Sequence, residues 1–178
     1  YSMQSTIYIE PKDEDADIDE AEERFSKIFG VIGYARACVC EKDMDAITKM
    51  APEYLNDTLA GFKTFKVESK RADKKFPLGS MEISREVGAA LLRANPRISV
   101  DVHNPEITVR VEIREKAAYI HGETKPGAGG IPVGTGGKAA ILISGGLDSP
   151  VAAWMMAKRG GADGHSLCEP AVHERART

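Results

Sequence analysis

The sequence predicts a mixed α/β fold of the α+β type, followed by the start of a parallel α/β domain. Strand-like segments alternate with segments whose apolar residues recur every three or four positions, which is typical of a mixed fold. A continuous apolar run at residues 139–143 precedes a glycine-rich turn, as in a parallel strand covered on both faces. The chain has 178 residues, of which 42% are hydrophobic and 29% charged, so its composition is that of a globular protein.

The first half of the chain alternates strands and helices. We expect strand, helix, strand, helix and strand at residues 6–10, 17–29, 32–40, 44–59 and 62–69. Gly30 and Gly61 end the two helices, and Pro52 strains the second.

The second half contains one more helix and several short strands. We expect a helix at residues 80–94 and three strands of a meander at residues 100–102, 107–113 and 117–122. Ser80 is expected to cap the helix, and Asn95-Pro96 to end it. Residues 127–138 are rich in glycine and proline and are predicted to form a linker, after which a new domain begins.

Charge is distributed unevenly, although 24 Lys and Arg nearly balance 27 Asp and Glu. Residues 10–23 are strongly acidic, which mainly indicates a solvated loop leading into a helix. A basic stretch is interleaved with Phe62, Phe65 and Phe76, and its cations are Lys63, Lys66, Lys70, Arg71, Lys74 and Lys75. Such a stretch is equally typical of a solvated face and of a surface that grips a phosphate backbone and stacks on bases.

Several classes of site are not expected. Cys38, Cys40 and Cys168 make neither a disulfide framework nor a zinc site, and we interpret them as inert thiols. His103 and His121 are isolated, so no metal site is predicted. No apolar run approaches the roughly 20 residues that span a bilayer, and no signal segment opens the chain, so we expect a cytoplasmic protein.

The motif that carries chemistry is Ser144-Gly145-Gly146-Leu147-Asp148-Ser149-Pro150, directly after the apolar run. Adjacent glycines let the backbone approach a phosphate, and a following helix points free amides at the anion. Ser149 is predicted as N-cap and Pro150 as the first helical residue. Asp148 would repel a phosphate unless Mg²⁺ or an amide network offsets its charge. The alternative is a tight strand-to-helix turn with no ligand.

Two other phosphate motifs do not fit. A Walker A loop needs Ser or Thr after Gly137-Lys138, where the chain has Ala139. The glycines at positions 134 and 136 fit a loose dinucleotide motif, but they precede a strand instead of following one.

The motif resembles the PP-loop of ATP pyrophosphatases, a signature that thiouridine synthases share with GMP synthetase-like and NAD synthetase-like amidating enzymes. The upstream sequence narrows this choice. Residues 65–82, 85–88, 100–105 and 111–114 resemble the THUMP domain of the ThiI-type tRNA sulfurtransferases, which are tRNA 4-thiouridine synthases. Residues 126–138 resemble the interdomain linker of the same family, and the similarity covers nearly all of residues 24–161.

The resemblance implies a domain order. Residues 1–60 would be a ferredoxin-like subdomain without its opening, and residues 61–124 a THUMP core, or 19–124 in a broad definition. A linker at 125–138 and the start of a PP-loop domain at 139–164 would follow.

The resemblance also implies a reaction, in which ATP adenylates O4 of a tRNA uridine and a persulfide sulfur from a cysteine desulfurase displaces AMP. Some members also supply sulfur for the thiazole of thiamine, and we expect a homodimer. The ATP-binding residues would be Leu142, Ile143, Ser144, Gly145, Gly146, Asp148 and Ser149, with Mg²⁺ as a companion ion. The tRNA-binding residues would be the six cations of the basic stretch, and no catalytic residue is expected because the family's cysteines lie beyond residue 178.

The tail departs from the family pattern. Read one base out of phase, a back-translation of residues 165–178 gives Ile-His-Phe-Ala-Ser-Pro-Pro-Tyr-Thr-Ser-Glu-Arg-Ala, which is the family's expected continuation. We therefore expect a frame-shifted tail and a fragment truncated at both ends and inactive alone. The alternatives are a THUMP module that only binds RNA and a PP-loop amidating ligase.

Overall fold

A computed structural model describes residues 2–3, 6–13, 15–142, 145–161 and 166–167. The chain divides into two compact units. The sheet unit comprises Ala35–Lys125, and the terminal unit comprises Tyr1–Tyr34 together with Pro126–Thr178. Helices and strands are interleaved in both, so the mixed α/β architecture predicted from the sequence is confirmed.

The sheet unit is built on five strands in the order β4-β8-β7-β5-β6. Their bounds are Cys38–Cys40 for β4, Ala118–His121 for β8, Ile107–Ile113 for β7, Thr64–Arg71 for β5 and Ser99–Val100 for β6. Strand β5 runs parallel to both of its neighbours, β6 and β7. The pairs β7-β8 and β8-β4 are antiparallel.

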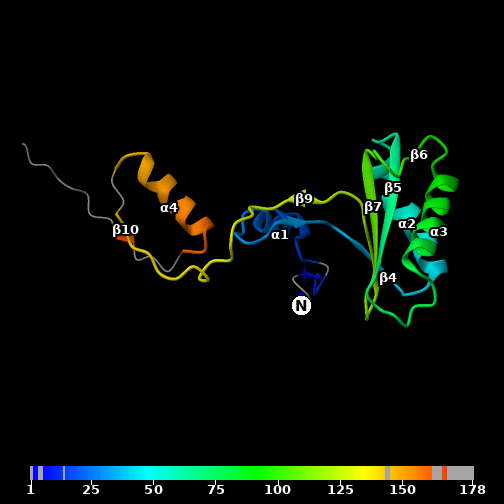
Figure 1. Ribbon diagram of the computed structural model, residues 1–178, viewed down its shortest axis with the longest axis horizontal. Coiled ribbons are helices and arrows are strands. Elements are labelled where there is room, and N and C mark those ends of the chain that lie inside the picture. Colours follow the sequence, from blue (N-terminus) through cyan, green and yellow to red (C-terminus); the bar gives the residue numbers. More distant parts are fainter. Residues whose placement is uncertain (1, 4–5, 14, 143–144, 162–165, 168–178) are drawn as a thin grey trace, which may run out of the picture. The chain divides into compact units, whose positions relative to one another are not determined.

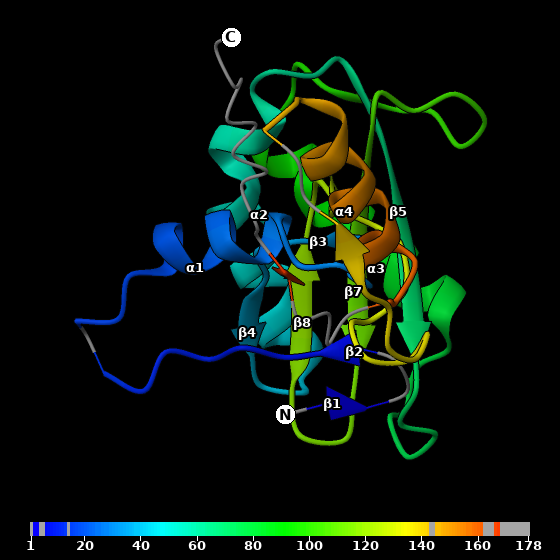
Figure 2. The same cartoon turned by 90° about the vertical axis from the view of Figure 1, so that its left-hand side faces the viewer.

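Helices α2 (Met44–Leu59) and α3 (Ser80–Ala94) cover one face of this sheet (Figure 1). In Figure 2 the sheet is viewed from its other face, so both helices lie behind the strands. Each helix buries one stripe of apolar residues at a spacing of three or four, namely Ile47, Ala51, Leu55 and Leu59 in α2, and Ile83, Val87 and Leu91 in α3. This spacing places the side chains one above another, facing the sheet.

The core lies between the helices and the sheet. Strand β7 alternates strictly, with Ile107, Val109, Val111 and Ile113 buried and the residues between them half-exposed. Burying an aliphatic side chain of this size contributes about 1.5–3 kcal/mol. The alternation therefore leaves the second face of the sheet polar, and this face carries Thr108, Arg110 and Glu112 on β7.

Strand pairing differs from the expected meander. Strand β6 pairs with β5, where Phe65 is opposite Val100, and not with β7. Helix α3 connects β5 to β6, which lies on one side of β5. The chain then crosses to the other side of β5, where β7 pairs with it. Pairing of this kind is decided by contacts between distant segments, which local alternation does not encode.

The expected strand at residues 32–40 is two strands, β3 (Gly33–Tyr34) and β4. The chain leaves the terminal unit between them, at Tyr34. Strand β3 pairs with β9 (Lys125–Pro126), the second point at which the chain changes unit. Both β4 and α2, which we expected in a first domain ending at residue 60, share the sheet and core of residues 61–124.

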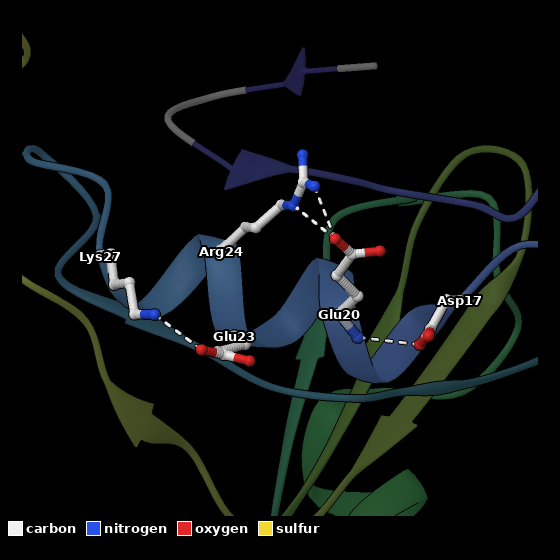
Figure 3. Close-up of polar contacts among 5 residues, drawn as sticks. All are labelled: Asp17, Glu20, Glu23, Arg24 and Lys27. Carbon is white, nitrogen blue, oxygen red and sulfur yellow. Dashed lines mark hydrogen bonds and ion pairs between the residues drawn. The ribbon is translucent and has the colours of Figure 1, made fainter.

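In the terminal unit, helix α1 (Ile18–Ser26) carries the acidic segment on solvated faces (Figure 3). The Asp17 carboxylate caps the helix by accepting from the Glu20 amide at 2.9 Å. Arg24 pairs with Glu20, and Lys27 with Glu23, one turn apart. These side chains are more than half exposed, so solvent screens both pairs and each contributes little to stability.

The other elements of the terminal unit are short. They are strands β1 (Ser2–Met3), β2 (Thr6–Ile7), β10 (Ile141–Leu142) and β11 (Ser166–Leu167), and helix α4 (Asp148–Lys158). Strands β10 and β11 pair in parallel. The prediction of a strand covered on both faces at residues 139–143 is wrong for this chain, because Leu142 is 84% exposed. The described chain offers that side chain no second layer to pack against.

Candidate functional site

The glycine-rich turn joins β10 to α4, as the sequence predicts. Gly145, Gly146 and Leu147 are exposed, and a Cβ built on Gly145 would meet nothing within 4 Å. The open backbone at this turn leads directly into the first helical residue, Asp148. An anion placed there would face the amides of the first turn of α4 and the positive end of its dipole.

Helix α4 starts two residues earlier than predicted, at Asp148 and not at Pro150. The N-cap is Leu147 and not Ser149, and no side chain caps the helix. Ser149 and Pro150 instead lie inside the first turn, where the missing amide of a proline breaks no helical hydrogen bond. The N-cap side chain therefore does not compete with a ligand for the helix amides.

Asp148 lies in that first turn and is exposed. A carboxylate is stabilised at a helix N-terminus, but it repels a phosphate unless a cation lies between them. Mg²⁺ typically takes one or two protein carboxylates and completes its shell with phosphate oxygens and water. The donor set at the turn fits this arrangement, since Asp148 would be the one carboxylate. Among the described residues, no group of three His, Cys, Asp or Glu side chains could hold a metal ion unaided.

The structure describes some of the other residues predicted for the turn and not others. Leu142 ends β10, so only its backbone is oriented by strand pairing while its side chain is in solvent. Ile143 and Ser144 lie outside the described residues. The segment from Gly145 to Ser149 is continuous, and its first four residues are exposed.

The basic stretch divides between a strand and a loop. Lys66 and Lys70 lie on β5, and their side chains point to the polar face of the sheet because the intervening positions turn inward. Lys66 pairs with Glu68 at 2.6 Å, and Arg110 approaches the same carboxylate at 3.5 Å. The hydrogen bond from Lys66 and these cations lower the pKa of Glu68. Lys66 is therefore already engaged by a carboxylate.

The aromatic residues of the stretch cannot stack on bases as the sequence suggested. Phe65 is fully buried and Phe76 is only 6% exposed, and both belong to the core. Phe62 is half-buried and packs against the same core. Alternation along β5 points Phe65 at the helices, so the stacking interpretation is wrong for these residues.

The loop after β5 presents Lys74 and Lys75, which are both exposed. It is pinned to the sheet by the amides of Ala72 and Asp73, which donate to the Ile113 carbonyl at 2.9 and 3.3 Å. Arg71 donates to the carbonyls of Phe76 and Leu78 at 3.1 and 3.3 Å. Arg71 therefore organises this loop, and is only half-exposed. Lys63, also exposed, lies just before β5.

Two residues that hold the loop were not singled out by the sequence. Lys42 Nζ donates to the Asp73 carboxylate at 2.7 Å, and the other Asp73 oxygen accepts from the Lys75 amide at 2.9 Å. The bond from Lys42 is the main reason that the pKa of Asp73 is lowered. No local signal could have found the pair, because 31 residues separate its members.

The polar face of the sheet holds a further group of titratable residues. Arg114, almost fully buried, donates to Glu112, and His121 lies opposite Arg110 in the register. Burial lowers the pKa of His121, and its Nδ1 has no partner among the described residues. Cations and carboxylates alternate here, so the face lacks the single sign that would attract an anion strongly.

The two described thiols are poor nucleophiles. Burial raises the pKa of Cys38, and it raises the pKa of Cys40 to about 11. Both thiols are therefore protonated at neutral pH, whereas the thiolate is the reactive form.

Within the described part of the chain, no helix is both long and apolar enough to cross a membrane.

Comparison with known proteins places both candidate regions in one family. A THUMP domain family model matches residues 41–121, and a model of the thiamine biosynthesis protein ThiI matches residues 134–167. The probable tRNA sulfurtransferase of Caldanaerobacter subterraneus subsp. tengcongensis is 51% identical over 154 residues. That of Alkaliphilus metalliredigens is 47% identical over 183 residues, which covers 99% of this chain. The chain belongs to the tRNA sulfurtransferase family.

The chain spans only part of these tRNA sulfurtransferases. Its match with the first covers 86% of this chain and 39% of that protein, and its match with the second covers 45% of that protein. The crystal structure of a 4-thiouridine synthetase–RNA complex with bound ATP is similar, with a TM-score of 0.74, 38% identity, and coverage of 85% of this chain and 39% of that one. PH1313 from Pyrococcus horikoshii has a TM-score of 0.73 and 31% identity, over 80% of this chain and 49% of its own.

Each of the two candidate regions lies inside one of the family matches. The loop with Lys74 and Lys75 lies inside the THUMP match. The glycine-rich turn and α4 lie inside the ThiI match.

Proposed function

We propose that this chain contributes RNA binding and nucleotide binding to an ATP-dependent tRNA sulfurtransferase that makes 4-thiouridine. One observation carries the proposal: the open glycine turn at the uncapped start of α4 lies inside the segment that resembles ThiI. The similarity to a 4-thiouridine synthetase structure that holds both RNA and ATP supports it. In this reaction ATP adenylates O4 of a tRNA uridine, and a persulfide sulfur then displaces AMP.

The glycine-rich turn binds the nucleotide in this proposal. The exposed backbone at Gly145 and Gly146 and the first amides of α4 would hold the ATP phosphates, and Ser149 would contribute from the same turn. Ser144 would belong to the same phosphate loop, and the backbone of Leu142 and Ile143 would flank the nucleotide. Asp148 would hold Mg²⁺, which would neutralise the phosphate charge beside the carboxylate. Fixed amides stabilise the charge on pyrophosphate as it leaves, because they need no reorientation during the reaction.

The loop after β5 binds the RNA in this proposal. Lys74 and Lys75 are exposed on a loop fixed at both ends, so little ordering remains to be done when they meet phosphates. Lys70 is exposed at the loop end of β5, and Lys63 is exposed just before the opposite end of the strand. Lys66 is already paired with Glu68, and Arg71 is engaged with loop carbonyls. We therefore rank Lys74 and Lys75 first among the six predicted cations.

The sulfur chemistry needs further participants. Neither Cys38 nor Cys40 is assigned as the nucleophile, because burial keeps both thiols protonated. A cysteine desulfurase would supply the persulfide, and the reaction would take place in the cytoplasm. A homodimer and sulfur delivery for the thiazole of thiamine belong to the same proposal.

One crossed titration tests the proposal. The wild type, Asp148→Ala and the double variant Lys74→Glu/Lys75→Glu are each titrated with MgATP and with tRNA. Asp148→Ala should weaken MgATP roughly ten-fold or more, the size of one charged contact, and leave tRNA affinity unchanged. The double variant should weaken tRNA and reduce the salt slope by about 1 per lost phosphate contact, leaving MgATP unchanged.

The control is Lys49→Glu, one lysine-to-glutamate change at an exposed site on α2, with half the charge change of the double variant. On a logarithmic scale it should alter tRNA affinity by far less than half as much as the double variant. If wild type binds tRNA but not MgATP, the chain is an RNA-binding module alone. If charge reversal at Lys74 and Lys75 leaves tRNA affinity and its salt slope unchanged, the RNA assignment is wrong.

A further inference from the structure

The glycine-rich segment after β9 is bonded along its length to other parts of the terminal unit. We call residues 127–137 the glycine strap. On one side it meets the turn that follows α1, where the Gly30 amide donates to the Gly129 carbonyl at 2.8 Å. The Gly129 amide donates back to Val31 at 2.9 Å, and the Gly127 amide donates to Ile32 at 2.9 Å. The strap is thus tied to the turn by a short ladder, although its composition alone suggested a linker.

On its other side the strap meets the C-terminal end of α4. The Ile131 amide donates to the Lys158 carbonyl at 2.9 Å, and the Gly136 amide donates to the Gly160 carbonyl at 2.8 Å. The last carbonyls of a helix have no partner within the helix. Strap amides satisfy the carbonyl of Lys158, the last helical residue, and that of Gly160, just beyond the C-cap.

Close approach makes glycine necessary at particular strap positions. A Cβ on Gly130 would lie 2.3 Å from the Lys158 carbonyl oxygen, and one on Gly136 would lie 2.8 Å from the Gly160 carbonyl carbon. Backbone atoms cannot yield as a flexible side chain does, so a Cβ would force strap and helix apart. By contrast, a Cβ on Gly134 or Gly137 would meet nothing within 4 Å.

An aromatic contact joins the turn after α1 directly to α4. Phe29, just after α1, meets Trp154 of α4 edge-on, with ring centroids 5.5 Å apart. Lys158 Nζ lies 4.9 Å from the centroid of the same indole ring. Helix α4 buries none of its side chains. These contacts and the strap therefore account for much of what holds the helix.

We propose that the glycine strap, together with the Phe29–Trp154 contact, positions the nucleotide turn by fixing α4 against the turn after α1. An eleven-residue helix transmits a displacement of one end to the other as a stiff rod. Gly130 is then a positioning residue that acts on a site at the opposite end of the helix. The inference rests on the proposed function for the ligand, MgATP.

The test compares Gly130→Ala with Gly137→Ala in the full chain. Both glycines have φ near +82°, so the two alanines carry the same backbone strain, and only the first meets Lys158. Trp154 is the single tryptophan of the sequence, so its fluorescence reports on α4 directly. Gly130→Ala should increase acrylamide quenching of Trp154 and weaken MgATP about ten-fold or more, since a misplaced site loses its geometry. Gly137→Ala should do neither.

A second variant tests the inference independently, in case Gly130→Ala does not fold. Phe29→Leu removes the ring contact and keeps an apolar side chain, and it should change quenching and MgATP affinity in the same direction. Far-UV circular dichroism verifies that the sheet unit remains folded in every variant. Equal quenching and equal MgATP affinity in Gly130→Ala and Gly137→Ala would overturn the inference. If the wild type binds no MgATP, the proposed function fails, and unchanged Trp154 quenching in Gly130→Ala would separately overturn the strap's role.

Discussion

At the scale of single residues, the basic loop depends on a carboxylate that carries the opposite charge to its neighbours. Asp73 accepts from Lys42 Nζ at 2.7 Å and from the Lys75 amide at 2.9 Å, so it joins the loop to the segment before α2. On charge alone, removing an acid beside an RNA surface should tighten binding. If Asp73 instead orders the loop, its removal should weaken binding, and the sign of the effect separates the two roles.

We predict that Asp73→Asn weakens tRNA binding by roughly three- to ten-fold, because Lys74 and Lys75 are no longer held in one arrangement. The measurement is a tRNA titration at fixed salt. Asp57→Asn, which removes the same charge from an exposed site on α2, serves as control and should leave affinity unchanged or slightly tighter. Tighter binding by Asp73→Asn would show that the carboxylate acts only through its charge.

The pH dependence of this contact follows from the sign of the pKa shift. The Lys42 hydrogen bond holds the pKa of Asp73 below its ordinary value of 3.8. A group with a lowered folded pKa contributes fully above its unfolded pKa and loses the contribution as pH falls through the folded value. The Asp73 contact is therefore constant from pH 8 to pH 5, and a fall in tRNA affinity within that window has another source.

Sequence reasoning at this scale found exposed cations but not their partners. Lys74 and Lys75 were recognisable because charge and sequence proximity are local properties. The burial of Phe65 and Phe76 was not, because it depends on which face of β5 the helices cover. Arg71 looked like an RNA contact, yet it donates to two loop carbonyls.

At the scale of elements, the two long helices were predicted to within one residue and the short strands were not. Helix α2 (Met44–Leu59) has the predicted bounds and α3 (Ser80–Ala94) the predicted end, because apolar spacing and end signals are local. The cap of α3 was misplaced by one residue: Gly79 is the N-cap, and its amide donates to Glu82 at 2.7 Å. Strands β3, β6 and β10 have two residues each, too few for any alternation to define them.

Helix α3 contains a glycine that its packing does not require. A Cβ on Gly88 would meet Val67 Cγ2 at 3.7 Å, an ordinary van der Waals contact. Glycine in a helix interior costs about 1 kcal/mol relative to alanine. We predict that Gly88→Ala raises the free energy of unfolding by about 1 kcal/mol, measured from the midpoint of urea unfolding at constant slope.

The matched control for that variant is the reverse change in the same helix. Ala89→Gly should lower the free energy of unfolding by about 1 kcal/mol, because Ala89 is the next residue of α3. A loss of stability in Gly88→Ala would mean that β5 and α3 cannot accommodate the added methyl group.

At the scale of the whole molecule, stability is concentrated in one of the two units. Every buried hydrophobic side chain of the described residues, from Ile47 to Ile120, lies in the sheet unit. Helices α1 and α4 bury none of theirs. The nucleotide turn was recognisable from the sequence because glycine, acid and hydroxyl residues lie together, but the exposure of α4 and the contacts of the strap depend on segments far apart in the chain.

This asymmetry predicts that the two units unfold separately. Trp154 reports on the terminal unit, whereas far-UV circular dichroism mainly reports on the sheet unit, since α2 and α3 have 16 and 15 residues and α1 and α4 have 9 and 11. In a urea titration the Trp154 transition should come at lower urea than the dichroism transition, because regions with few buried apolar contacts open at lower free energy. A two-state chain would instead give coincident transitions.

A core variant identifies which transition belongs to which unit. Leu55 is almost fully buried on α2, and Leu55→Ala should lower the stability of the sheet unit by about 2–5 kcal/mol. The dichroism transition should move to lower urea. The midpoint of the Trp154 transition should keep its wild-type value as long as it stays below the midpoint of the dichroism transition. If the wild-type transitions coincide, or if Leu55→Ala shifts both equally, the chain unfolds as one cooperative body, and α4 must draw stability from contacts that its exposed side chains do not reveal.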